Sequence, residues 1–256
     1  MKTLITILFL ILSPIINAQD LVGGFVVYKS PLKEFTLIDQ GKKDKTEPLV
    51  VGKTYTFPKE SFEITTPTNS ETIVYFSNDT LVRLYGNSDF RVDGFSQQVA
   101  NTTGLPEKVK NSECMLNLAL TSGEIEVISS VTDTNSLCVL QTPLVNLGLT
   151  KGIYVIHVEE KSVIVSIVEG SIKVYDNVTN KEQDVTSGKL IGIFPYGEMS
   201  ARAKELFSDK TITAVVKEIL PTNLKKLTES VNVLNGYYQY IIFAVIDNKM
   251  VGIKLK

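Results

Sequence analysis

The chain offers few side chains of the kinds that carry out catalysis. Its 256 residues include one histidine, His157, which alternates within a segment of Ile, Tyr and Val. A lone histidine there is more often a hydrogen-bonded core or rim residue than a ligand, and it cannot build a metal site of several histidines. No G-x-S-x-G motif supports a Ser-His-Asp triad, and no Gly-rich phosphate loop is present. We therefore expect no catalytic residue, no metal and no cofactor.

Two cysteines, Cys114 and Cys138, leave two alternatives open. In an exported protein they can form a disulfide, which would stabilise the fold by about 3 kcal/mol in the chain-entropy model. They can also be two separate buried thiols that pack as small apolar residues. Sequence does not give the Cα separation that a disulfide requires. Neither cysteine belongs to a C-x-x-C pair, so zinc binding and thioredoxin-like redox chemistry have no support.

Pairs of carboxylates are the remaining candidates for catalysis, because glycoside hydrolysis needs only two of them at a set separation. Glu124 and Glu126 point to one face of a predicted strand, and Glu169 faces its neighbours across a predicted hairpin. Acids at alternate strand positions usually form the solvated face of a sheet. The chain has no Trp, the usual sugar-stacking residue, although Tyr and Phe can substitute. A polysaccharide-binding or polysaccharide-acting β protein that uses a carboxylate pair is therefore the alternative function.

Residues 1–18 have the pattern of a signal peptide. Lys2 precedes an apolar run, residues 4–12, that is too short to span a bilayer. The expected cleavage site lies between Ala18 and Gln19, with an uncut anchor helix as the alternative. No later segment approaches a membrane-spanning length. We expect an exported protein, periplasmic or extracellular, with no membrane span after cleavage.

The charge balance argues against nucleic acid and anionic membrane as partners. The chain has 26 basic and 28 acidic side chains, a formal net charge of −2, and the predicted signal peptide removes one lysine. Such a balance leaves no basic footprint.

Alternation of apolar and polar residues dominates from Leu21 to Ile193 and predicts a mainly β fold. Residues 141–193 have the pattern of four short strands separated by tight turns. Gly123 and Gly170 lie in predicted turns, at 121–123 and 169–171, and polar residues 77–80 and 159–162 predict hairpins. Short strands with Gly, Asn and Asp between them are typical of a rolled β sandwich, a jelly roll or a β-helix-like body. We expect an N-terminal β lead-in at 19–43 and a β domain at 44–196.

Residues 197–256 differ in character and predict a small C-terminal α+β appendage. Helix formers fill 199–207, and Ser208 or Asp209 could cap a second helical stretch reaching Leu220. A third helix follows Pro221, and residues 238–246 and 250–255 predict a hairpin. The third helix carries an apolar stripe that should pack on this hairpin or on the β domain: Leu224, Leu227, Val231 and Leu234.

Several strand-and-turn segments between residues 44 and 193 match the pattern of one known family. Thr142-Pro143 and Gly148 match its opening T-P-x-x-x-x-G, residues 163–174 match its central strands, and 187–189 match its closing turn. Upstream matches are 62–66, 77–84, 87–92 and 118–125. In these segments the chain resembles the FecR-type domain, the periplasmic module named for the regulator of ferric-dicitrate transport. Two departures are Thr150-Lys151-Gly152 in place of the family's Arg-Gly-Thr, and the missing Gly at Asn78-Asp79.

The resemblance implies stacked β turns and a module that binds rather than catalyses. Family regulators join this module to a membrane helix and a cytoplasmic part, and neither is found in this sequence. We therefore expect an exported, non-enzymatic interaction module that docks an unidentified protein or cell-surface material, such as a surface glycan. Its oligomeric state does not follow from the sequence.

Overall fold

The computed structural model describes residues 23–38, 45–57, 61–97, 113–132, 136–177, 179–194, 200–207, 214–235, 241–246 and 249–254. The predicted signal peptide, residues 1–18, and the cleavage residues Ala18 and Gln19 lie outside this part of the chain.

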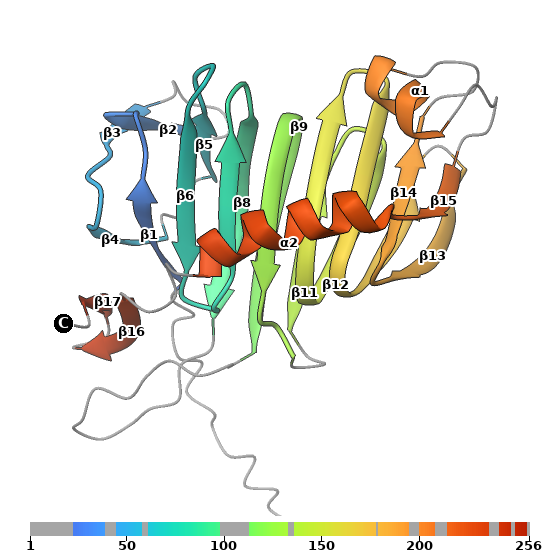
Figure 1. Ribbon diagram of the computed structural model, residues 1–256. Helices are drawn as coiled ribbons and strands as arrows, with labels where there is room; N and C mark the ends of the chain where they lie inside the picture. The colour runs from blue at the N-terminus through green and yellow to red at the C-terminus, as the bar shows by residue number, and fades with distance from the viewer. Residues whose placement is uncertain are drawn as a thin grey trace, which may run out of the picture.

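Most of the described chain forms two β layers that lie face to face and share three long strands (Figure 1). The front sheet has the order β4 (Thr54–Thr56), β1 (Gly24–Lys29), β6 (Glu71–Phe76), β7 (Leu81–Tyr85), β9 (Cys114–Ser129), β11 (Val145–Glu159), β12 (Ser162–Asp176), β14 (Lys189–Ile193) and β15 (Ala214–Glu218). The back sheet has the order β3 (Lys45–Pro48), β2 (Glu34–Ile38), β5 (Ser61–Thr65), β8 (Asp89–Gln97), β9, β10 (Leu137–Gln141), β11, β12 and β13 (Lys181–Thr186). The predicted mainly β fold class is confirmed.

The long strands cross from one sheet to the other at glycines. β9 pairs with β8 in the back sheet as far as Ser122, and from Gly123 onward it pairs with β11 in the front sheet. β12 likewise leaves β14 after Ile167 and pairs with β13 from Ser171. Gly123 has φ 99° and Gly170 has φ 83°, a region that residues with a Cβ seldom adopt. Each glycine therefore lets one strand change direction without ending.

The space between the sheets is filled by one large apolar cluster. Alternation along the strands points one set of side chains inward, including Tyr154, Ile156 and Val158 of β11. At the β1 end the cluster is aromatic, with Phe25 stacked on Phe62 at a centroid distance of 4.6 Å. The apolar residues of the alternating sequence pattern therefore form the core.

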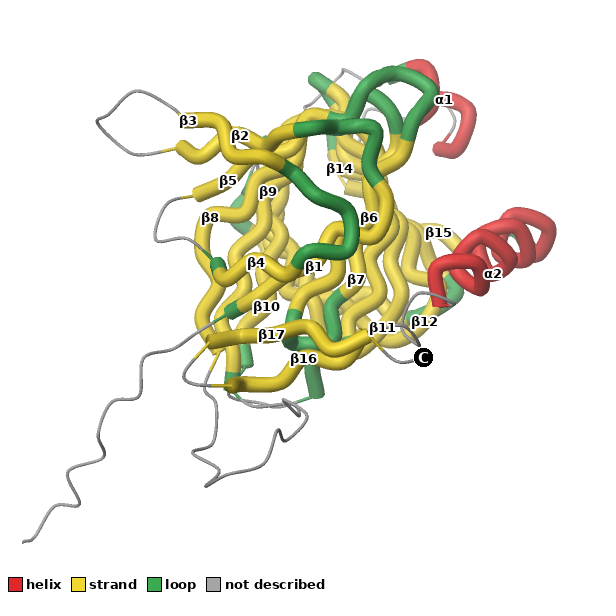
Figure 2. Tube along the Cα trace, turned by 90° about the vertical axis from the view of Figure 1, so that its left-hand side faces the viewer, coloured by secondary structure: helices red, strands yellow, loops and turns green. Residues whose placement is uncertain are grey.

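Two helices, α1 (Ala201–Phe207) and α2 (Pro221–Asn235), cover the outer face of the front sheet. Figure 2 shows both helices on the same side of the strands, and in Figure 1 α2 runs across them. The predicted apolar stripe of α2 faces the sheet: Val231 and Leu234 pack near Ile73 and Leu81, and Leu224 and Leu227 join a second cluster around Ile164 and Phe207. The prediction that this stripe packs on the β domain is confirmed.

The C-terminal hairpin, β16 (Ile241–Ile246) and β17 (Lys249–Lys254), forms a separate two-stranded sheet whose second strand lies against β4. This confirms the predicted hairpin. The segment 197–256 also extends the front sheet with β15 and covers it with α2.

Three local predictions are wrong. The predicted turns at 121–123 and 169–171 are bends inside β9 and β12, because a positive-φ glycine serves a bend as well as a turn. Residues 141–193 do contain the predicted four strands, β11 to β14, but two of them are not short, since β11 and β12 have 15 residues each. The predicted second helix contains β15 instead, because the front sheet offers β14 as a pairing edge to the valines at 215 and 216.

Replacing Gly123 with alanine should weaken the fold. A Cβ there would lie 2.4 Å from the Cα of Ser88, and φ would remain 99°. We expect the free energy of unfolding, measured by urea denaturation, to fall by about 2 kcal/mol or more. Gly148→Ala is the matched control, because its Cβ would meet Lys173 Cβ at 3.4 Å, and it should cost less than about 1 kcal/mol. Equal, small losses in both variants would contradict the role of the bend.

Candidate functional site

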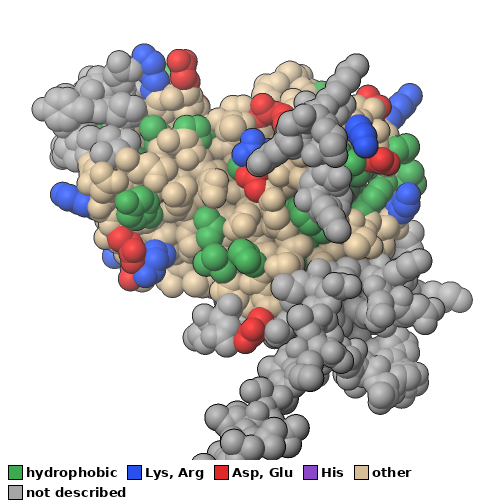
Figure 3. All heavy atoms as spheres, turned by 180° about the vertical axis from the view of Figure 1, so that it is seen from behind, with side chains coloured by type: hydrophobic (Ala, Val, Ile, Leu, Met, Phe, Trp, Pro, Cys, Tyr) green, Lys and Arg blue, Asp and Glu red, His purple; other side chains and the backbone are tan. Residues whose placement is uncertain are grey.

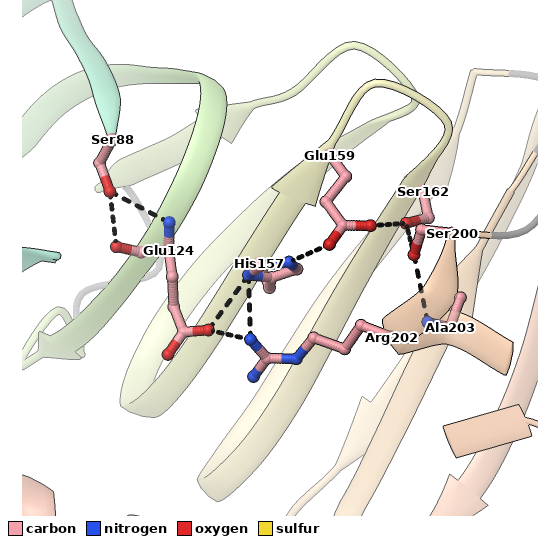
Figure 4. A network of polar contacts seen from close by, with 8 residues as sticks. All are labelled: Ser88, Glu124, His157, Glu159, Ser162, Ser200, Arg202 and Ala203. Atoms are coloured by element: carbon pink, nitrogen blue, oxygen red, sulfur yellow. Dashed lines mark hydrogen bonds and ion pairs between the residues drawn. The ribbon is translucent and has the colours of Figure 1, made fainter. Parts of the chain in front are cut away.

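The one histidine of the chain lies at the centre of a polar cluster between the front sheet and α1 (Figure 4). His157 is on β11, directly opposite Glu124 of β9, and Glu159 follows two positions later on the same face of β11. Arg202 belongs to α1, which covers this face of the sheet, and its side chain reaches Glu124 and His157. The cluster therefore joins two strands and one helix.

The contacts of this cluster use both nitrogens of the imidazole ring. Nδ1 of His157 lies 3.1 Å from Glu124 Oε2, and Nε2 lies 2.8 Å from Glu159 Oε1. Nη1 of Arg202 donates to Glu124 Oε2 at 2.6 Å and lies 3.2 Å from His157 Nδ1. The predicted interpretation of His157 as a hydrogen-bonded rim residue agrees with this geometry.

Ser200 connects the same cluster to the start of α1. Its hydroxyl accepts a hydrogen bond from the backbone N–H of Ala203 at 3.1 Å, which is the usual role of a serine that caps a helix. Ser162 Oγ lies 2.8 Å from Ser200 Oγ and 3.3 Å from Glu159 Oε2, so its hydroxyl can donate to the carboxylate while it accepts from Ser200. The helix start is thus linked through two hydroxyls to a carboxylate of β11.

The cluster shifts the pKa values of its members in opposite directions. Burial would lower the pKa of His157, but the hydrogen bonds that its ring donates to Glu124 and Glu159 outweigh burial and hold the pKa above the ordinary 6.5, with Arg202 acting against them. Burial would raise the pKa of Glu124, yet His157 and Arg202 leave it below 4.5. The pKa of Glu159 is also lowered, because His157 and Ser200 outweigh burial. These directions are those of a mutually neutralising ionic cluster.

A second polar cluster lies under α2. Arg83 Nη1 donates to Glu126 Oε2 at 2.9 Å and to Ser230 Oγ at 3.0 Å, and Ser230 donates to Glu126 Oε1 at 2.6 Å. Tyr85 completes it, with its hydroxyl 3.2 Å from Ser230 Oγ. The side chains of Arg83 and Glu126 are only 7% and 3% exposed, so loss of Arg83 would leave the buried carboxylate of Glu126 without a cation, at a cost of about 3–5 kcal/mol. Arg83 has a second ion pair, with Glu71 Oε2 3.4 Å from its Nε. Because Ser230 belongs to α2, the cluster fixes where the helix lies on the sheet.

The predicted carboxylate candidates have different surroundings. Glu124 and Glu126 share the outer face of β9, as predicted, but α1 and α2 cover that face, so the prediction of a solvated face is wrong for Glu126. Glu169 is exposed at the bend of β12, opposite Ile153, and belongs to neither cluster. Among the described residues, no group of three or more His, Cys, Asp or Glu side chains is arranged to hold a metal ion.

Cys114 and Cys138 both lie in the core and are not bonded to each other. β9 and β10 run parallel, and Cys138 is opposite Leu116, two residues beyond Cys114. The two Cα atoms are therefore offset by two residues along the strand direction and by one interstrand distance. This places them roughly 8 Å apart, which is beyond the range of a disulfide. Burial, with a smaller effect from Cys114, raises the pKa of the Cys138 thiol.

The outer face of the back sheet carries exposed apolar side chains. Met115 of β9 and Leu137 of β10 are directly opposite each other and are 47% and 50% exposed. Tyr175 of β12 points to the same outer face and is 39% exposed. Figure 3, viewed from behind, shows small hydrophobic patches separated by uncharged and charged groups. Sequence reasoning missed this surface, although alternation along β9 and β10 placed these residues opposite the core-facing set.

Comparison with protein-family models and with curated protein sequences finds no match for this chain. Two similar solved structures are each described as "a putative anti-sigma factor from Parabacteroides distasonis ATCC 8503". One is 11% identical with a TM-score of 0.41 and covers 77% of this chain and 100% of its own. The other is 10% identical with a TM-score of 0.40 and covers 76% of this chain and 99% of its own. At these TM-scores the likeness supports no argument about fold or function.

The register of β9 and β10 predicts two free thiols in the protein as isolated without reductant. We expect neither Cys114 nor Cys138 to react with a thiol reagent while the protein is folded, because both are buried, and both to react after unfolding in denaturant. Finding no titratable thiol in the unfolded, unreduced protein would show instead that the two cysteines are bridged.

Proposed function

We propose that this chain is an exported module of the FecR type that binds a protein partner through the outer face of its back sheet and catalyses no reaction. The observation that carries the proposal is the unequal covering of the two sheets. α1 and α2 cover the outer face of the front sheet, whereas Met115 and Leu137 form an exposed apolar pair on the outer face of the back sheet. Methionine and aromatic side chains are enriched in protein interfaces.

The FecR assignment is supported by the conformation of the matched turn segments. Gly123, Gly170 and Gly188, all within segments that resemble the family, have positive φ angles. Asp79 has φ 59°, so it adopts the left-handed conformation at the site where the family has a glycine. The departing segment, residues 150–152, lies where β11 passes between the sheets, and Thr150 Oγ1 donates to Ser171 O at 2.7 Å. These residues therefore support the bend of β11 in this chain.

The absence of catalysis is supported by how the ionisable groups of both clusters are used. His157, Glu124 and Glu159 contact one another and α1, and Arg83 and Glu126 contact each other and α2. These contacts hold helices onto the sheet. Export is supported by the N-terminal sequence pattern alone, and neither of the described helices is long and apolar enough to cross a membrane.

Binding can be tested by capture from the exported fraction of the native host with matched surface variants. The test variant is Met115→Arg with Leu137→Arg, and the control is Val233→Arg, which places a charge on the exposed side of α2, where Val233 is 62% exposed. We expect the wild type and the control to capture the same protein, and the test variant to lose it, with all three equally folded by circular dichroism. A partner held equally well by all three would overturn the assignment of this face.

A polysaccharide ligand is the second candidate, and Tyr175 is the observation that favours it. Tyr175 lies between Asn146 of β11 and Glu182 of β13 on the outer face of the back sheet, so an aromatic ring is flanked by an amide and a carboxylate. Those groups suit stacking against a sugar and hydrogen bonding to its hydroxyls. In the same experiment, binding to host polysaccharide that is lost in Tyr175→Ala and kept in the Met115 and Leu137 variant would favour this candidate.

A further inference from the structure

His157 Nδ1 faces two groups that require opposite protonation states. Glu124 Oε2, at 3.1 Å, needs a proton on Nδ1, because a carboxylate only accepts hydrogen bonds. Arg202 Nη1, at 3.2 Å, needs the lone pair of an unprotonated Nδ1, because a guanidinium only donates. A single proton on the imidazole therefore decides whether Arg202 faces a hydrogen-bond acceptor or a second cation.

We propose that His157 is a pH-sensitive switch for α1: protonation of its ring weakens the docking of this helix on the front sheet. The two carboxylates beside His157 belong to the sheet, Glu124 to β9 and Glu159 to β11, so they remain whether or not α1 is docked. α1 adds the cation of Arg202, the hydroxyl network of Ser200 and cover from solvent. On the side of β12, His157 is opposite the uncharged Ile164.

The direction follows from linkage between the two equilibria. Docked α1 brings Arg202 beside the ring, and both Arg202 and burial act to lower the pKa of His157. Release of α1 removes Arg202 and the part of the burial that the helix provides, so the ring binds its proton more readily in the released state. By reciprocity, protonation of the ring must favour release of the helix. Protonation of Glu124 at lower pH acts in the same direction, because it removes the carboxylate that Arg202 binds.

Overall folding has the opposite dependence on this histidine. The pKa of His157 in the folded protein lies above the ordinary value, so its contribution to stability is complete below pH 6.5 and is lost as the pH rises through the folded pKa. Mild acid should therefore strengthen the sheet between β9 and β11 and loosen α1. This opposition distinguishes a local release from a general loss of stability in acid.

Release of α1 would uncover part of the front sheet. Phe207 of α1 packs on Phe194 at a centroid distance of 6.0 Å and lies against Gly192, and Ala203 joins the same cluster as Ile164 and Leu190. α1 is a single short helix of 7 residues, and Ala203 and Phe207 are its buried residues, so its docking rests on these two side chains and the polar cluster. A small change in the cluster can therefore shift its docking equilibrium.

The test combines hydrogen exchange of residues 201–207 with NMR titration of the only imidazole in the chain. On lowering the pH from about 8.5 to about 5.5, the range in which histidine titrates, we expect the opening equilibrium of α1 to rise about three- to tenfold after correction for intrinsic exchange. The modest size reflects the 44% exposure of Arg202, and added salt should reduce it. Over the same range the exchange of β9 and β11 should slow or stay constant.

Two variants separate this account from a structural role of the residues. Arg202→Gln should raise the pKa of His157 and reduce the pH dependence of α1, and His157→Gln should abolish that dependence within the histidine range. Glu182→Gln, which breaks an exposed ion pair with Lys173 in the back sheet, should leave both readouts unchanged. Protection of α1 in the wild type that is constant or increases as the pH falls through the titration would overturn the proposal, even if a variant fails to fold.

Discussion

Three strands, β9, β11 and β12, belong to both sheets, and the rest of the structure depends on this sharing. A strand that pairs in the back sheet with one half and in the front sheet with the other must change direction without losing its neighbours. Gly123 and Gly170 allow this with positive φ angles, and the register of β11 shifts at the same level. Because the sheets share strands, their separation and the inward direction of the core side chains are set together.

Helices α1 and α2 cover the outer face of the front sheet, whereas exposed apolar side chains lie on the outer face of the back sheet. We therefore give the charged groups of the front sheet a structural role and the back sheet the proposed binding role. Polar side chains of the front sheet hold the two helices. His157 contacts Arg202 of α1, and Arg83 and Glu126 contact Ser230 of α2. Buried ion pairs often add little net stability. Here the Arg83–Glu126 pair reaches Ser230 of α2 and so links this helix to a fixed point on the sheet. In the back sheet, the outward residues of β9 and β10 keep apolar side chains in solvent. The proposed binding role rests on that face, which neither of the described helices covers.

Alternation and turn chemistry predicted the mainly β fold, the hairpins at 77–80 and 159–162, and the apolar stripe of α2. A glycine in the sequence is compatible both with a turn that ends a strand and with a bend inside a strand. The continuity of β9 and β12 was therefore not predictable. The burial of Glu126 depends on Ser230, 104 residues away, and no local pattern contains that contact. β15 was missed because its pairing edge is supplied by β14. Arg202 could not be recognised from the sequence as a partner of His157, because their contact depends on where α1 packs on the sheet.

The most direct measurement is native-state hydrogen exchange resolved along β9, β11 and β12. If each strand is continuous between the two sheets, amides before and after its bend should open with the same free energy, as one cooperative unit at the global stability. For β9 the comparison is between residues 114–122 and residues 123–129. Two distinct opening free energies, with one half of each strand exchanging while the other stays protected, would contradict the account, because the sheets would then be separate units joined by turns.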